Sequence, residues 1–155
     1  MKNEGLTLVE LLVIVIVIAI ILLFFRYPNE PYIISDEDLA ISNLYTVKNS
    51  QKAFTHCEGG YASTFKELRD DKIAAGQPAY LDIDFSGIVQ GYRYTLEPAG
   101  DSRTGYNGLT VYMDFECIAE PVEYKEGTTR SFYVDSSGII RAQVGKVATK
   151  DSGHL

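Results

Sequence analysis

The chain has no tryptophan, and among its 155 residues there are only two cysteines and two histidines. A zinc site needs about four such ligands close together, and His154 lies far along the sequence from His56 and Cys57. His56 and Cys57 do not suggest a catalytic thiolate–imidazole pair, because neighbouring residues of a helix point about 100° apart. We therefore expect no metal site of this kind, no catalytic residues and no enzyme.

Positive charge is also scarce. The chain has 14 Lys and Arg against 21 Asp and Glu, which gives a formal net charge of −7. This balance argues against a surface that follows nucleic-acid phosphates, so we expect no nucleic acid as a partner. The acidic pairs Asp70-Asp71 and Asp82-x-Asp84 do not match the spacing of a defined calcium loop. We interpret them as solvated surface and expect no cofactor.

One stretch is entirely different in character. After Glu10, every residue from Leu11 to Phe25 is apolar. A helix of about 20 residues spans roughly 30 Å, the hydrocarbon thickness of a bilayer, so we expect a transmembrane helix over residues 6–26. An acid inside such a helix costs about 2.5–3.5 kcal/mol, and no Lys, Arg or His lies within it before Arg26. Glu10 is therefore protonated, reaches the head groups, or finds its partner in another molecule.

The nine residues Gly5-Leu-Thr-Leu-Val-Glu10-Leu-Leu-Val resemble the N-terminus of type IV pilins and type II secretion pseudopilins. The resemblance implies that residues 1–5 are a leader, which a prepilin peptidase removes between Gly5 and Leu6 before it N-methylates Leu6. It also implies that Glu10 pairs with the N-terminal amine of a neighbouring subunit. That amine, with an ordinary pKa near 8, is largely cationic at neutral pH. We expect Thr7 to hydrogen-bond nearby.

A second helix is predicted over about residues 35–58. Pro28 and Pro31 should end or bend the first helix, and Ser35 is a suitable N-cap for the second. The Gly59-Gly60 pair should stop it. Its apolar face follows steps of three and four residues: Ala40, Leu44, Val47, Gln51, Phe54 and Cys57.

Strand patterns occupy about residues 91–144. Residues 91–96 and 109–117 alternate, residues 130–144 have the pattern of a hairpin, and residues 98–108 have the composition of a loop. Residues 145–155 lack apolar periodicity and are predicted to be a loose tail.

The expected fold class is α+β. A long N-terminal hydrophobic spine helix, bent or broken near Pro28 and Pro31, is expected to pack on a small antiparallel sheet of three or four strands. This is the pilin fold that the resemblance implies, with residues 27–155 as an extracytoplasmic globular domain.

Cys57 and Cys117 both fall on apolar faces that point into the predicted helix–sheet interface. A disulfide between them is geometrically feasible if the two residues meet in height. The even number of cysteines and an extracytoplasmic location favour this bridge, and two separately buried thiols are the alternative.

The resemblance implies a structural subunit of a type IV pilus-like filament. The subunit would be a single-pass precursor in the bacterial inner membrane, handled there by an assembly platform. It would then polymerise with itself or other pilins into an extracellular pilus, the kind of fimbrium used in cell adhesion and motility. A pseudopilin in a periplasmic type II secretion filament is the alternative. A membrane-anchored extracytoplasmic binding domain or enzyme is a third possibility, for which no catalytic constellation speaks.

Overall fold

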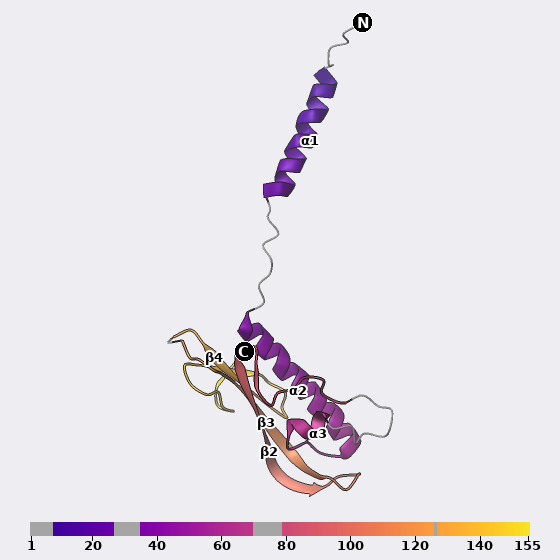
Figure 1. Cartoon of the computed structure of the whole chain (residues 1–155), viewed down its shortest axis with the longest axis vertical. Helices are drawn as coiled ribbons and strands as arrows, with labels where there is room; N and C mark the ends of the chain where they lie inside the picture. The colour runs from indigo at the N-terminus through magenta and orange to yellow at the C-terminus, as the bar shows by residue number, and fades with distance from the viewer. Residues whose placement is uncertain (1–7, 27–34, 70–78, 126) are drawn as a thin grey trace. The chain divides into compact units, whose positions relative to one another are not determined.

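The structure is a computed structural model, and it describes residues 8–26, 35–69, 79–125 and 127–155 (Figure 1). The chain divides into two compact units, residues Met1–Ile33 and Ile34–Leu155.

The first unit contains the helix α1, Leu8–Arg26, with 19 residues. No helix in the described ranges is both long enough and apolar enough to cross a membrane. The predicted transmembrane helix is therefore wrong, and so is the single-pass location in the inner membrane. The described helix has 19 residues, among them Glu10 and Arg26, whereas a span needs about 20 predominantly apolar residues.

The second unit begins with α2, Asp36–Glu58. The Ser35 hydroxyl accepts a hydrogen bond from the Asp38 backbone N–H (3.1 Å), and the Asp38 carboxylate accepts one from the Ser35 N–H (3.3 Å). This reciprocal capping satisfies two N–H groups at the start of the helix. At the other end Gly59 adopts the left-handed conformation, with φ of 86°, and its N–H donates to Thr55 O. The N-cap and the stop predicted from the sequence are both confirmed.

Within the described residues the sheet has six antiparallel strands, and each strand pairs with its neighbours in sequence. The strands are β1 (Ile88–Val89), β2 (Tyr92–Thr104), β3 (Thr110–Pro121), β4 (Arg130–Asp135), β5 (Arg141–Val144) and β6 (Gly153–His154). The expected fold is therefore wrong in its sheet of three or four strands. It is also wrong in its long apolar spine, because α1 has only 19 residues and belongs to a different unit from α2. The second helix, α2, does contact the sheet as expected. The strands β1 and β6 have two residues each, too few to show alternation.

The segment 145–155 is not a loose tail. Its strand β6 pairs with β5, with Gly153 opposite Ala142. Ala148 is fully buried, and the Ser131 hydroxyl donates to Lys146 O (2.6 Å). One buried methyl group and a few backbone hydrogen bonds hold this segment. The prediction was wrong because such contacts leave no periodic pattern of apolar residues in the sequence.

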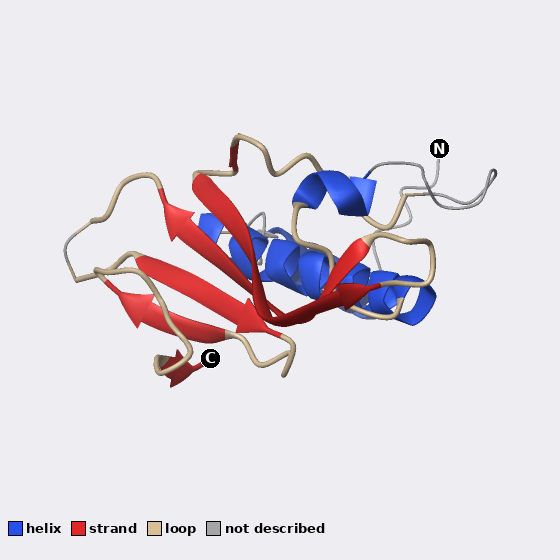
Figure 2. Ribbon diagram, turned by 90° about the horizontal axis from the view of Figure 1, so that it is seen from below, coloured by secondary structure: helices blue, strands red, loops and turns tan. Residues whose placement is uncertain are grey.

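The core lies between α2 and one face of the sheet, and Figure 2 shows the helix running along that face. A short helix α3, Phe65–Arg69, lies near α2 and buries Leu68. Burying a Leu or Phe side chain contributes about 1.5–3 kcal/mol. Large apolar side chains that are almost completely buried in this core are Leu44, Leu68, Leu81, Phe85, Phe115 and Phe132.

Two buried polar side chains fix α2 against its surroundings. The Gln51 amide donates to Ala62 O (2.9 Å) and accepts from Ala62 N–H (2.9 Å). The Asn43 amide donates to the Tyr94 hydroxyl (3.0 Å) and to Gln90 Oε1 (3.0 Å). Each of these contacts fixes the position of α2 along its own axis relative to a neighbouring segment.

Candidate functional site

Between Leu8 and Leu22, apolar side chains lie on every side of α1. All side chains from Leu8 to Leu22 are exposed within the unit, and Leu8 is 83% exposed. An extended exposed apolar surface marks a site of interaction. Because the apolar side chains surround the helix, they are covered only when partners pack on several sides.

Glu10 is the only charged residue between Leu8 and Leu22, and it lies in the first turn of α1. There its carboxylate is favoured by the helix dipole, by about 0.3–1 kcal/mol. The predicted cleavage and methylation site, Gly5 and Leu6, and the predicted contact residue Thr7 lie outside the described residues. Glu10 is therefore the one member of the predicted assembly site that the structure places.

The two cysteines are free thiols in the structure. Cys117 is buried in β3, whereas Cys57 is exposed at the end of α2, so the predicted position of Cys57 in the helix–sheet interface is wrong. The buried face of α2 continues from Gln51 through Phe54 to Glu58, seven residues or two turns after Gln51, and this turns Cys57 outward. Burial raises the pKa of the Cys117 thiol, which keeps it protonated and unreactive.

The acidic residues do not form a metal site in the described part of the chain, where no group of three or more His, Cys, Asp or Glu could hold an ion. Asp84 accepts a hydrogen bond from Ser86 N–H (3.0 Å) and forms an ion pair with Arg69 (2.8 Å). The hydrogen bonds from Ser86, and then Arg69, lower the pKa of Asp84. Asp70 and Asp71 lie outside the described residues.

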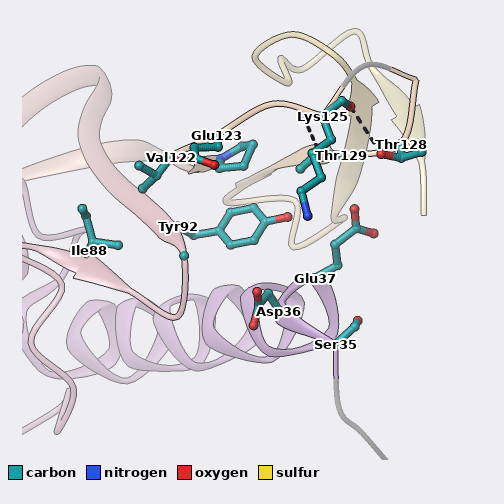
Figure 3. A pocket seen from close by; sticks show the side chains of 12 residues that line it. Ser35, Asp36, Glu37, Ile88, Tyr92, Val122, Glu123, Lys125, Thr128 and Thr129 are labelled. Atoms are coloured by element: carbon teal, nitrogen blue, oxygen red, sulfur yellow. Dashed lines mark hydrogen bonds between the residues drawn. The ribbon is translucent and has the colours of Figure 1, made fainter.

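A pocket of about 540 Å³ opens at the N-terminal end of α2; we call it the α2 pocket. Ile88 and Val122 give it apolar walls, and Figure 3 shows the Lys125 side chain extending into it toward Glu37. The lining comes from four separate parts of the chain: Ser35, Asp36, Glu37, Ile88, Gly91, Tyr92, Pro121, Val122, Glu123, Lys125, Thr128 and Thr129.

One side of the α2 pocket is rigidly built. The Glu37 carboxylate accepts hydrogen bonds from Arg130 Nε (2.9 Å) and from the Arg130 backbone N–H (3.1 Å), and its ion pair with Arg130 Nη2 measures 2.7 Å. The Tyr92 hydroxyl donates to Arg130 O (2.9 Å). Burial, and then the charge of Glu37, raise the pKa of Tyr92, so the phenol stays neutral. The contacts that Glu37 and Tyr92 make with Arg130 therefore fix this side of the α2 pocket.

An exposed aromatic residue, Tyr106, lies at the opposite end of α2. Its backbone N–H donates to Glu58 O (3.0 Å), and its ring lies over Gly59, about 3.1 Å from where a side-chain carbon would stand. The residue as a whole is nevertheless 79% exposed. We call residues 105–108, held by hydrogen bonds from Gly105 N–H to Leu109 O (2.7 Å) and from Gly108 N–H to Gly105 O (3.1 Å), the Tyr106 tip.

No motif in the sequence points to the α2 pocket or to Tyr106. The predicted loop 98–108 is in fact mostly strand, since β2 continues through Thr104. A tyrosine between Gly105 and Gly108 was the available signal for an exposed turn. The chain matches no protein-family model, no curated protein and no solved structure, so the resemblance of its first residues to prepilins is carried by the sequence motif alone.

Proposed function

We propose that the chain is a structural subunit of a type IV pilus-like filament, assembled through α1. The observation that carries the proposal is an exposed helix, apolar on all sides, with a single carboxylate in its first turn. The motif Gly5-Leu-Thr-Leu-Val-Glu10, which precedes and begins this helix, supports the same function. Packing of such helices against one another would cover the apolar surface.

In this function, cleavage after Gly5 creates a new amine on Leu6, and N-methylation leaves that amine able to carry a proton. The ordinary pKa of an α-amine is near 8, so it is largely cationic at neutral pH. The Glu10 carboxylate of a neighbouring subunit supplies the counter-charge. Because each helix from Leu8 to Leu22 carries one charge, only one axial register pairs that charge.

The pairing matters mainly because its loss would leave a buried charge without a partner. Removing one partner of a buried ion pair costs about 3–5 kcal/mol, because the other charge is then buried without compensation. A mismatched register would cost a similar amount. The apolar surface supplies the affinity and the single carboxylate supplies the register.

The test is Glu10→Gln, which keeps the size of the side chain and removes its charge. We expect filament yield from the full chain to fall at least about 100-fold, since about 2.8 kcal/mol corresponds to that factor. Sheared filaments are counted by negative-stain electron microscopy. Intact mass should show that the wild-type subunit begins at Leu6 and carries one extra methyl group.

The matched control is Glu97→Gln, which removes an exposed carboxylate from β2 and should leave assembly unchanged. Normal filaments from the Glu10→Gln chain would contradict the pairing. The same preparation separates pilin from pseudopilin, because a short pseudopilus is not recovered by shearing.

A further inference from the structure

We propose that the α2 pocket receives the Tyr106 tip of a second copy of the chain, so that the Ile34–Leu155 units associate head to tail. This inference rests on the proposed filament and names a contact that its globular units would make. It adds a second interface to the one formed by α1.

The two surfaces lie at opposite ends of one rigid element. The α2 pocket is built around Ser35–Glu37 at the start of α2, and the Tyr106 tip is bonded to Glu58 at its end. A helix of 23 residues is about 35 Å long, so the tip cannot reach the pocket of its own copy. A contact between different surfaces at opposite ends is heterologous, and repeating it gives an open chain of subunits.

The Tyr106 tip is suited to be the inserted part. Aromatic residues dominate the centres of interfaces, and a tyrosine buries about 150–250 Å². Backbone hydrogen bonds and the contact with Gly59 hold Tyr106 in place before binding, so little conformational entropy is lost. The α2 pocket, at about 540 Å³ and with Ile88 and Val122 as walls, has room for the ring and the residue beside it.

The polar groups of the two surfaces also match. A phenol both donates and accepts hydrogen bonds, and the α2 pocket offers the Lys125 amine as a donor and the Asp36 carboxylate as an acceptor. Near the other end of α2 lie two cationic side chains: Lys52, which is exposed, and Arg103, whose guanidinium donates to Gly59 O. They would face the acidic rim formed by Asp36 and Glu123, and such complementarity steers association in one orientation.

Assembly of the full chain tests the Tyr106 tip directly. We expect Tyr106→Ala to raise the protein concentration needed for filament growth at least about tenfold, as for truncation of a central aromatic contact. Tyr45→Ala is the control, because Tyr45 is an exposed tyrosine on α2 between the two ends and should not matter. Unchanged growth of the Tyr106→Ala chain would overturn the inference.

Photo-crosslinking identifies the partner surface. With benzoylphenylalanine in place of Tyr106 in the full chain, we expect crosslinks between two copies, in peptides that contain Ile88 or Val122. Val122→Trp, which fills the α2 pocket, should abolish these crosslinks. Val144→Trp should not, although Val122 and Val144 are both 45% exposed. Crosslinks to any other surface, or none, would refute the proposed contact.

The same crosslinking in the Glu10→Gln chain separates the two proposals. Crosslinks that persist without filaments support the Tyr106 contact and the role of Glu10 together. Normal filaments from Glu10→Gln, with crosslinks at the α2 pocket, would remove the proposed pairing and leave the head-to-tail contact standing. Wild-type filaments that form without crosslinks, together with a loss of filaments in the Glu10→Gln chain, would remove the head-to-tail contact and leave the pairing standing. Filaments of the Glu10→Gln chain that form without crosslinks would refute both proposals.

Discussion

Replacing Gln51 by methionine should destabilise the unit Ile34–Leu155 strongly, although the two side chains are similar in size. Gln51 and Ala62 are both fully buried, and two hydrogen bonds of 2.9 Å join the Gln51 amide to the backbone of Ala62. Gln51→Met removes both bonds and leaves a buried N–H and a buried C=O of Ala62 without a partner.

The magnitude follows from those two groups. A buried polar group left without its hydrogen bond costs about 1–3 kcal/mol, so the pair costs about 2–6 kcal/mol. Burial of the apolar methionine chain offsets part of this, and we expect a net loss of about 2–4 kcal/mol. A domain typically has only about 5–15 kcal/mol of stability, so the change is large.

The assay is urea unfolding of residues 34–155, a compact unit with its own core, followed by circular dichroism. The midpoint should fall while the slope with urea stays the same, because the surface exposed on unfolding is nearly unchanged. Asn49→Met, an exposed change two residues away on α2, should alter stability by less than about 0.5 kcal/mol. An equally small effect of Gln51→Met would mean that the Ala62 groups find other partners, and would refute the reasoning.

Two further predictions concern titratable groups. In the native unit a thiol reagent should label the exposed Cys57 and leave the buried Cys117 unlabelled until the protein unfolds, and rapid labelling of Cys117 would contradict its position in the core. Burial raises the pKa of Tyr94 from 10.0 to about 12, so the stability from its neutral phenol is complete below pH 10 and is lost as the pH rises through about 12. Tyr94→Phe should therefore make urea midpoints fall less steeply between about pH 10 and pH 12. An unchanged slope would show that Tyr94 does not contribute to this loss.

The sequence predicted α2 well because its signals are local. Ser35 and Asp38 cap one end and Gly59 ends the other, and residues within a few positions of each other make all of these contacts. The prediction failed for Cys57 because helix periodicity allows the buried face to continue either three residues after Phe54, at Cys57, or four residues after it, at Glu58. Only a contact distant in sequence, the hydrogen bond that the Asn107 amide donates to the Glu58 carboxylate (2.7 Å), accompanies the burial of Glu58.

The strands were harder to predict. Pro98 and Gly100 suggested a loop, but β2 passes through them with a shift in register between Ala99 and Ser102. Such irregularities admit Pro and a glycine with positive φ, here 72° at Gly100. Local composition cannot tell this arrangement from a loop.

Of the candidate functional residues, one could be predicted from the sequence and the others could not. Glu10 could be singled out from sequence, because a lone carboxylate in an apolar stretch is visible in one dimension. The α2 pocket could not, because Asp36, Ile88, Val122 and Lys125 meet only after the sheet has formed. Tyr106 carries no signal of its own beyond the flanking glycines.

The sequential order of the six strands has a consequence for the speed of folding. Each strand of the sheet pairs with the one that precedes or follows it in the chain, so the sheet can grow by adding one hairpin after another. Contacts between residues near in sequence require little loop closure, and chains dominated by them fold faster than those with crossed connections. The outermost strands, β1 and β6, have two residues each and offer little edge for mispairing. Nascent chains of this protein are therefore expected to pass quickly through the stage at which open strands aggregate.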